Sequence, residues 1–220
     1  GERFGDATLI ETGISSSAFR FDGAGAIGLG TNRPWLRDAA GVTFSAWIRS
    51  DGPTGGNQVI VGTSVNPNIG APGSSRAELR LLGDGMLNAG IRDEDTTRNI
   101  IGFDGSIVAE DGTAPLFKHV ATVVDVANDS VRLYVDGDEV EAHIDTNFAK
   151  PTLADAVAAA AAIGANDDAA LGDGTPAASF DGIIDEVRIA PFARSAEWVR
   201  THYLDVTYQL GTYTTTVFRP

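Results

Sequence analysis

The segment LFKHVATVVDVANDSVRLYVDGDEV, residues Leu116 to Val140, decides the fold class of this chain. It contains two runs of apolar and β-branched residues that alternate with a period of two. The polar segment Ala127 to Ser130 joins the runs, and Asp136-Gly137 follows the second run. This pattern predicts a β-hairpin and the start of another strand. Because both faces of each arm are fairly apolar, we expect central strands of a layered β-structure.

Outside this hairpin, the chain repeats short β-prone runs separated by turn residues. Arg76 to Leu82 and Met86 to Arg92 form a second predicted hairpin across Gly83-Asp84-Gly85. Repeated Asp-Gly dipeptides favour the positive-φ turns that join antiparallel strands. The pattern therefore predicts an all-β antiparallel sandwich. Further strands are expected at residues 7–10, 17–21, 26–29, 42–50, 58–63, 98–103 and 180–189, with 17–21 paired to 26–29.

Two segments depart from the strand pattern. Thr152 to Ala161 includes an alanine run and is expected to be a short helix or an irregular insertion, with a strand starting at 162–164. Ser195 to Tyr203 is predicted to be a short helix, because Ser195 can act as its N-cap and Glu197 lies in the first turn, where the helix dipole favours an acid.

The C-terminal segment Thr207 to Phe218 is β-prone and contains no charged residue. Such a strand would be adhesive if it were left unpaired. We expect it to pair within the domain, beside the strand at 7–10, in preference to pairing with a neighbouring subunit.

Composition and charge limit the function classes. A chain of 220 residues with 43% hydrophobic residues can bury a sizeable core, so we expect one domain over residues 1–220. Lys and Arg number 16 against 30 Asp and Glu, and the net charge of -14 disfavours nucleic acids and membrane surfaces as partners. The chain contains no Cys and no apolar run long enough to span a membrane. It begins at Gly1 without a signal peptide, which leaves open a removed leader or a domain cut from a longer chain.

Three ordered motifs resemble a known family. His119-Val120-Ala121 and Arg132 to Gly137 are similar to the H-V-A and L-Y-V-D-G motifs of laminin G-like, concanavalin A-like lectin/glucanase jelly-roll domains. Val42 to Arg49 resembles the S-A-W-V strand of that family, and Phe180 to Ile189 resembles its G-x-I-D-E-V-R-I strand. The resemblance implies a jelly roll and covers about residues 18 to 203, with N- and C-terminal extensions.

Two details refine this resemblance. Ala193 to Glu197 is similar to the A-R-S-A-E turn that leads into a short helix in the family. Phe117 stands where the family usually has a tryptophan before its histidine, and it keeps an aromatic side chain for the core.

The sequence lacks the motifs of common enzyme classes. Retaining glycoside hydrolases need two carboxylates about 5 Å apart, and the E-x-D-x-x-E pattern that supplies them is absent. Asp185 and Glu186 are adjacent, so we expect their side chains on opposite faces of a strand. The three histidines, His119, His143 and His202, are scattered, and no G-x-S-x-G motif or phosphate-binding loop is present. We therefore predict a non-enzymatic protein in which His119 is buried and neutral.

A structural calcium ion is the cofactor that the resemblance implies, because related jelly rolls often carry one. Calcium prefers oxygen ligands on loops, whereas soft metals lack ligands in a chain with no Cys and isolated histidines. The competing interpretation is that the acidic residues are turn formers and solvated charge. The candidate ligands are Asp22, Asp185, Asp167, Asp168 and Asp173, with Asn166 beside them.

A carbohydrate-binding surface needs an exposed aromatic ring beside polar groups. Trp35 is the best candidate, because it lies in a loop that contains Pro34, although a core position for its ring stays equally open. Trp47 and Tyr134 are expected to be packed, and Trp198 is expected to dock the helix. The polar candidates beside Trp35 are Asn32, Arg33 and Arg37.

Together these inferences predict a non-enzymatic binding module, extracellular or on the cell surface, for adhesion or glycan recognition. Its partner would be a glycan or a cell-surface protein, with no nucleic acid and no membrane insertion. The alternative is a structural subunit of an extracellular filament, sheath or virion that assembles with copies of itself. An enzyme with concealed carboxylates ranks third.

Overall fold

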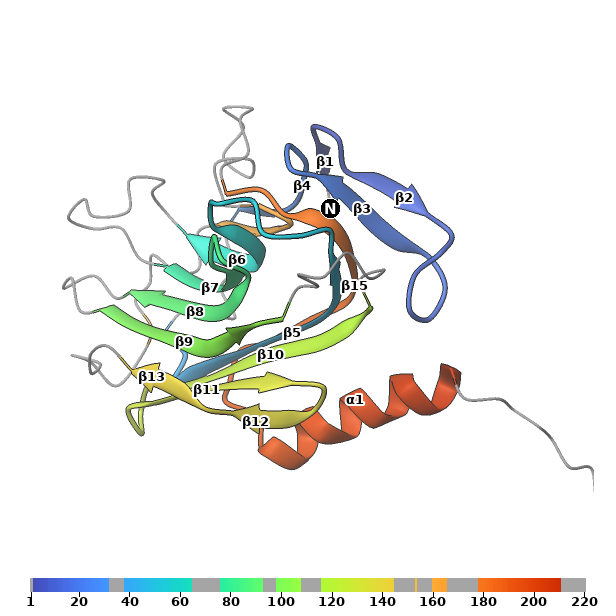
Figure 1. Cartoon of the computed structure of the whole chain (residues 1–220). Coiled ribbons are helices and arrows are strands. Elements are labelled where there is room, and N and C mark those ends of the chain that lie inside the picture. Colours follow the sequence, from blue (N-terminus) through green and yellow to red (C-terminus); the bar gives the residue numbers. More distant parts are fainter. Residues whose placement is uncertain are drawn as a thin grey trace, which may run out of the picture.

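The computed structural model describes residues 2–31, 38–64, 76–92, 98–107, 116–144, 153, 160–165 and 178–210. These residues form two antiparallel β-sheets and one helix, and the sheets pack face to face (Figure 1). The predicted all-β sandwich with a C-terminal helix is confirmed.

Within the described residues, one sheet has eight strands and the other has seven. The eight-stranded sheet contains, in spatial order, β1 (Glu2–Phe4), β4 (Ala26–Thr31), β14 (Ala160–Ile163), β6 (Gln58–Ser64), β7 (Arg76–Leu81), β8 (Met86–Arg92), β9 (Arg98–Ser106) and β13 (Ala142–Ile144). The seven-stranded sheet contains β12 (Asp138–Val140), β11 (Ser130–Val135), β10 (Lys118–Asp125), β5 (Gly41–Ser50), β15 (Asp181–Ala190), β3 (Ala18–Asp22) and β2 (Thr8–Ile10).

The hairpins predicted from alternation are present. Strand β10 pairs with β11, and β7 pairs with β8. Asp136 and Gly137 both have positive φ, 51° and 84°, and they form the two-residue turn between β11 and β12. This conformation explains the Asp-Gly sequence, because such a turn needs two residues that tolerate positive φ. A side chain at position 137 would also clash, since a Cβ atom there would lie 2.8 Å from the ring of Tyr203.

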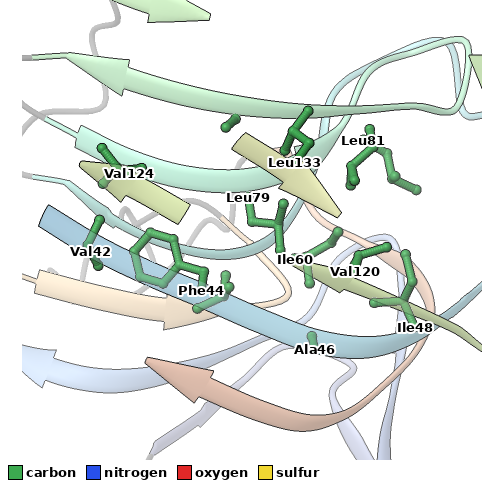
Figure 2. Packing of buried hydrophobic residues seen from close by; sticks show 14 of the residues in the cluster. Val42, Phe44, Ala46, Ile48, Ile60, Leu79, Leu81, Val120, Val124 and Leu133 are labelled. Atoms are coloured by element: carbon green, nitrogen blue, oxygen red, sulfur yellow. The ribbon is translucent and has the colours of Figure 1, made fainter. Parts of the chain in front are cut away.

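The core lies between the two sheets (Figure 2). Alternate residues of β5 point inward, and Val42, Phe44 and Ala46 are fully buried. Ile60 and Leu79 meet them from the eight-stranded sheet. Burial of each large side chain of this kind contributes about 1.5–3 kcal/mol, so the interleaved faces account for much of the stability of the sandwich.

The helix α1 (Ala196–Leu210) covers the outer face of the seven-stranded sheet. Its first turn is capped as predicted, because the Trp198 amide donates a hydrogen bond to Ser195 Oγ at 3.2 Å. Val199 and Trp198 pack against a cluster of Ala121, Val123 and Tyr134 on that face. This packing confirms the expected role of Trp198 in docking the helix.

The strand predicted from Thr207 onward is wrong for residues 207–210, because these residues continue α1. The Thr207 hydroxyl donates a hydrogen bond to the Tyr203 carbonyl at 2.8 Å, and Val206 is buried. Packing and this bond therefore outweigh the intrinsic β-propensity of the residues. The strand at Thr8–Ile10 pairs with β3, and residues 211–218 lie outside the described residues.

Two further expectations are corrected. Strands β3 and β4 belong to different sheets, because Phe21 and Ile27 reach the same core from opposite layers. Ala160 and Ala161, expected to be helix or insertion, belong to β14 between β4 and β6. Ala161 is fully buried there, so sheet packing overrides the helix propensity of alanine. Residues 152 and 154–159 lie outside the described residues.

Candidate functional site

The outer face of the eight-stranded sheet contains a cluster of three polar side chains. In β7, Ala77 and Leu79 are fully buried in the core, so the alternating residues Glu78 and Arg80 lie on the opposite face. Asn88 in β8 lies directly opposite Arg80 and shares that face. The backbone register of the hairpin therefore brings these three groups together.

The geometry of this polar cluster is well defined. Arg80 Nη1 donates to Glu78 Oε2 at 3.1 Å, and Arg80 Nε donates to Asn88 Oδ1 at 3.0 Å. Glu78, Arg80 and Asn88 are only 1%, 4% and 0% exposed. Burying two charged groups costs free energy unless the charges are paired and hydrogen-bonded. The guanidinium group of Arg80 donates to both neighbours from one rigid plane, so it holds the cluster in one arrangement.

Glycines surround the polar cluster. Gly62 and Gly90 lie directly opposite Glu78 on the two neighbouring strands. A Cβ atom at Gly62 would lie 2.9 Å from Glu78 Cγ, and one at Gly90 would lie 3.2 Å from Arg80 Cζ. Gly102, opposite Asn88 in β9, has no heavy atom within 4 Å of a Cβ built there. Gly62 and Gly90 thus make room for the side chains of Glu78 and Arg80, and the space beside Gly102 is open.

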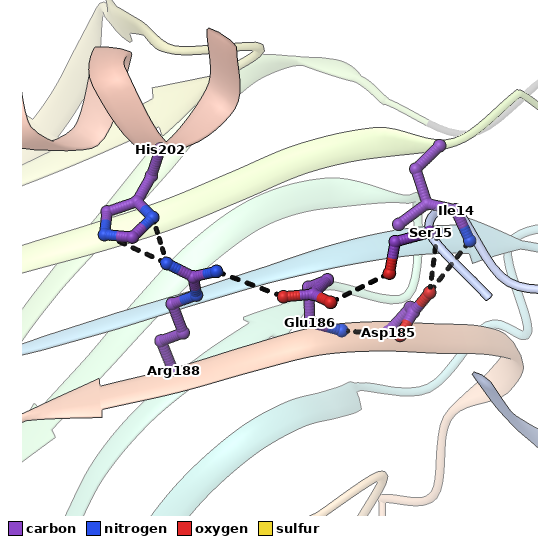
Figure 3. A network of polar contacts seen from close by, with 6 residues as sticks. All are labelled: Ile14, Ser15, Asp185, Glu186, Arg188 and His202. Carbon is purple, nitrogen blue, oxygen red and sulfur yellow. Dashed lines mark hydrogen bonds and ion pairs between the residues drawn. The ribbon is translucent and has the colours of Figure 1, made fainter. Parts of the chain in front are cut away.

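A second polar network crosses the outer face of the seven-stranded sheet (Figure 3). Ser15 Oγ donates to Glu186 Oε1 at 2.9 Å, and Arg188 Nη2 donates to Glu186 Oε2 at 3.1 Å. Arg188 Nη1 also contacts the ring nitrogens of His202 in α1. The network therefore joins the loop before β3, the strand β15 and the helix.

Asp185 and Glu186 do not lie on opposite faces as expected. The pairing of β15 with β5 shifts register between Asp185 and Arg188, and Glu186 has a φ of 49°. This bulge turns both carboxylates toward the same loop. Asp185 Oδ2 accepts a hydrogen bond from the Ile14 amide at 2.8 Å, while Glu186 accepts one from Ser15. Both carboxylates thus anchor the loop.

The charges of this second network shift the pKa values of its members. Burial raises the pKa of Glu186, but hydrogen bonds from Ser15 and Arg188 outweigh it and hold the pKa below its usual value. Burial, together with the positive charge of Arg188, lowers the pKa of His202. The Glu186 carboxylate is therefore ionised at neutral pH and His202 is neutral.

His119 lies beneath α1 beside two aromatic rings that stack on each other. Its ring centroid is 5.5 Å from that of Trp47 and 6.0 Å from that of Tyr203. It is 2% exposed, and burial lowers its pKa to about 4, which confirms a buried and neutral histidine. Within the described residues, its Nδ1 atom has no hydrogen-bond partner. Trp47 and Tyr134 are buried as expected.

A groove of about 250 Å³ opens at the side of the sandwich. Phe19 and Ile184 of the seven-stranded sheet and Ile27 and Ile163 of the eight-stranded sheet line it. Ligand sites usually occupy about 300–1,000 Å³ and combine an apolar lining with a few converging polar groups. The carboxylates at the rim of this groove already anchor the loop at Ile14 and Ser15, so the groove is a poor candidate for ligand binding.

The predicted site residues are only partly covered by the described structure. The carbohydrate candidates Asn32, Arg33, Trp35 and Arg37 and the calcium candidates Asp167, Asp168 and Asp173 lie outside the described residues. Asp22 and Asp185 are described, and the structure does not bring them together. Asp22 lies opposite Asp181, which is four residues from Asp185, or about 13 Å along the strand.

Asp22 and Asp185, the two described calcium candidates, each accept hydrogen bonds from other groups of the chain. Asp22 Oδ1 accepts a hydrogen bond from Arg20 Nε at 2.9 Å, and Asp185 accepts bonds from backbone amides. Within the described ranges, no group of three or more acidic or histidine side chains is arranged to hold a metal ion. The other predicted calcium ligands, Asp167, Asp168 and Asp173, lie outside the described residues.

The polar cluster was not among the predicted site residues, although the sequence contains a signal for it. The run Ala77 to Leu81 alternates apolar residues with Glu78 and Arg80, and Leu87 to Ile91 alternates apolar residues with Asn88 and Gly90. This period of two predicts one buried face and one outer face. Only the cross-strand register, however, shows that the polar residues of the two strands are neighbours.

The fold and its sequence motifs match a known superfamily. A family model described as the concanavalin A-like lectin/glucanases superfamily matches residues 21–200. The chain belongs to this superfamily. The match confirms the resemblance carried by the three ordered motifs. No curated protein matches this chain.

Several solved structures share the fold of this superfamily member. A heptameric SAP-like pentraxin from Limulus polyphemus is 16% identical, with a TM-score of 0.61 over 87% of this chain and 83% of that chain. The CBM40 domain of Ruminococcus gnavus IT-sialidase, bound to α2,3-sialyllactose, is 13% identical, with a TM-score of 0.59 over 84% of this chain and 96% of that chain. A structure of botulinum neurotoxin type C is 12% identical, with a TM-score of 0.64 over 93% of this chain and 46% of that chain. Cell entry of that toxin depends on interaction with two ganglioside molecules.

These comparisons establish the fold, because all three identities are low. Some of the proteins with this fold are sialidases or parts of sialidases. No helix in the described part of the chain has the length and apolarity needed to cross a membrane.

Proposed function

We propose that this domain is a non-enzymatic glycan-binding module, extracellular or at the cell surface, and that the ligand binds the outer face of the eight-stranded sheet. The observation that carries the proposal is the polar cluster of Glu78, Arg80 and Asn88 set among Gly62, Gly90 and Gly102. Sugar hydroxyls need fixed donors and acceptors, and a surface with few side chains lets a ring approach the sheet.

The arrangement of α1 supports this choice of face. The helix covers the apolar and aromatic residues on the outer face of the seven-stranded sheet. Because the polar cluster is itself buried, its role in the proposal is to order the sheet surface, and the partly exposed Gly102 beside it marks where the ligand meets the sheet. Superfamily relatives with glycan ligands, such as the domain bound to sialyllactose, support the ligand class.

A non-enzymatic role agrees with the surroundings of the carboxylates. Asp185 and Glu186 are hydrogen-bonded to the loop at Ile14 and Ser15 or to Arg188. Glu186 has a lowered pKa, the opposite of the raised pKa expected of a general acid in glycoside hydrolysis.

A glycan array tests the proposal with two matched tryptophan variants. Gly102→Trp adds bulk to the proposed face, and Gly56→Trp adds the same side chain to the loop before β6, where a Cβ also has no close neighbour. We expect the wild-type protein and Gly56→Trp to bind the same glycans and Gly102→Trp to lose that binding. Equal binding by all three proteins would place the ligand on another surface, and no binding by the wild type would contradict the glycan-binding function.

Self-assembly is the competing function, and light scattering after size-exclusion chromatography separates the two. A glycan-binding module is expected to elute as a small, defined species whether or not glycan is present. Large assemblies of the isolated chain, without glycan binding on the array, would favour the structural subunit.

A further inference from the structure

Basic and aromatic side chains line up where β15 leads into α1. Arg194 Cζ lies 4.2 Å from the ring centroid of Phe192 and 4.7 Å from that of Trp198. Trp198 meets His202 edge to face, with ring centroids 3.9 Å apart, and Arg188 Nη1 contacts the ring of His202. We call these five residues, Phe192, Arg194, Trp198, His202 and Arg188, the cation–aromatic strip.

The backbone of the strip is held by the buried Thr43 of β5. The Thr43 hydroxyl donates a hydrogen bond to the Phe192 carbonyl at 2.9 Å and accepts one from the Arg194 amide at 3.0 Å. Stacking on two rings restricts the guanidinium plane of Arg194 as well. The strip is therefore ordered before any ligand arrives, which lowers the entropy cost of binding.

Arg194 is the charged member of the strip that lacks an acidic partner. Arg188 pairs with Glu186 at 3.1 Å, whereas no carboxylate among the described residues forms an ion pair with Arg194. Its Nε atom is buried, and within the described part of the chain that atom has no hydrogen-bond partner. Guanidinium donors pair best with carboxylates, so the missing partner has the chemistry of a carboxylate.

The surroundings of Arg194 favour a peptide over a sugar. Arg194 already lies over the rings of Phe192 and Trp198, and Trp198 also packs against the apolar cluster beneath α1, so these rings offer little open face for a sugar to stack on. Phe192 is nevertheless 45% exposed and can contact an apolar side chain. The net charge of -14 repels a strongly acidic ligand, so one carboxylate fits better than a run of them.

We infer that the cation–aromatic strip binds a segment of a protein partner in which one carboxylate pairs with Arg194 and a neighbouring apolar side chain packs on Phe192. Arginine and aromatic residues are the types enriched at the centres of protein interfaces. The strip lies on the side of the sandwich that carries α1, away from the polar cluster, so the inference is independent of the proposed glycan site.

His202 provides a reporter within the strip. Burial lowers the pKa of His202, and the positive charges of Arg188 and Arg194 lower it further, whereas Asp205 and Glu186 raise it. A carboxylate bound at Arg194 offsets one of the positive charges. Binding should therefore raise the pKa of His202, an effect that a purely structural role of Arg194 does not produce.

The test is a titration followed by nuclear magnetic resonance of the labelled domain. The probes are a blocked pentapeptide with one glutamate flanked by two leucines and the same peptide with glutamine in place of the glutamate. The variants are Arg194→Gln and Arg200→Gln, which makes the same charge change at an exposed position of α1 that pairs with Asp138. Phe192→Ser changes an exposed side chain of the strip and replaces Arg194→Gln if that variant does not fold.

We expect the glutamate peptide to bind the wild type about tenfold more tightly than the glutamine peptide, because the charge-assisted contact needs the carboxylate. The signals of Phe192 and of the Trp198 indole should shift, and the pKa of His202 should rise on saturation. Arg194→Gln should weaken binding of the glutamate peptide by about tenfold, whereas Arg200→Gln should leave it within about twofold.

Four results would overturn the inference. They are failure of the glutamate peptide to bind at about 10 mM, equal affinity for the two peptides, affinity unchanged by Arg194→Gln, and binding that leaves the pKa of His202 unchanged. A lower melting temperature for Arg194→Gln with unchanged affinity would show that Arg194 only fixes the start of α1. None of these results bears on the glycan array, so the proposed function stands or falls separately.

Discussion

The outer face of the seven-stranded sheet is closed by a helix, whereas the outer face of the eight-stranded sheet contains a charged cluster set among glycines. On the first face, Ala121, Val123 and Tyr134 pack against Val199 of α1. On the second face, Glu78 and Arg80 occupy the corresponding alternating positions of a central strand.

This difference motivates the proposal that one outer face of the sandwich serves folding and the other serves glycan recognition. Apolar residues on an outer strand face need a cover, and α1 supplies it at the edge formed by β10, β11 and β12. Buried charges contribute little net stability, but they hold side chains in one arrangement. The predictions below test this comparison, beginning with the largest expected effect.

Replacing Val199 by Asp should release α1 from its sheet. Val199 is fully buried against Ala121 and Tyr134, so the new carboxylate would lie in an apolar contact. We expect a loss of about 4 kcal/mol in the free energy of unfolding, measured by thermal and urea denaturation. Thr201→Asp places the same charge on the exposed side of the helix and should change stability by less than about 0.5 kcal/mol. Equal losses in the two variants would show that α1 is not a structural cover.

Replacing Arg80 by Met should destabilise the opposite sheet by about 3 kcal/mol. The substitution removes the hydrogen bonds to Glu78 and Asn88 and leaves a buried carboxylate with less compensation. The double variant Glu78→Gln, Arg80→Met should recover part of the loss, because the buried charge is then absent. A single variant as stable as the wild type would mean that the cluster does not order the sheet. Urea denaturation of the three proteins measures these differences.

Lowering the pH should destabilise the helix-covered face through His119. Its pKa in the folded protein is about 4, against 6.5 when unfolded, so the unfolded state binds the proton more readily. This contribution to stability is complete above pH 6.5 and is lost as the pH falls toward 4, with a loss of about 2 kcal/mol at pH 5. His119→Gln should remove this part of the pH dependence. A wild-type stability that is constant between pH 7 and 5 would contradict the assignment.

Calcium should have the smallest effect. An ion present at ten times its dissociation constant would raise the free energy of unfolding by about 1.4 kcal/mol. Because Asp22 and Asp185 are engaged elsewhere, we expect the effect to depend on Asp167, Asp168 and Asp173. Thermal scans in millimolar calcium and in a chelator measure it, with magnesium as the control. An unchanged melting temperature would remove calcium from this account.

Alternation along the chain was sufficient to predict two of the hairpins, β10 with β11 and β7 with β8. The hairpin at Leu116 to Val140 and the Asp136-Gly137 turn are local features, and the structure contains both. The family motifs predicted a jelly roll and a strand at Val42 to Ser50, and the structure shows this strand as β5 at the centre of the seven-stranded sheet.

Features that depend on tertiary contacts could not be predicted in the same way. The bulge at Glu186 reverses the expected direction of a carboxylate, and the end of α1 at Leu210 depends on burial of Val206. The polar cluster depends on which residues of β7 and β8 lie opposite one another. Cross-strand register is a property of the folded sheet, so sequence spacing alone does not reveal it.

The most direct test of the account is to map where a glycan from the array binds, using nuclear magnetic resonance of the isotope-labelled domain. We predict that titration shifts the backbone amide signals of β7, β8 and β9, including Gly90 and Gly102, and leaves those of α1 unchanged. Shifts confined to α1 and the seven-stranded sheet would contradict the claim that the eight-stranded sheet is the binding face.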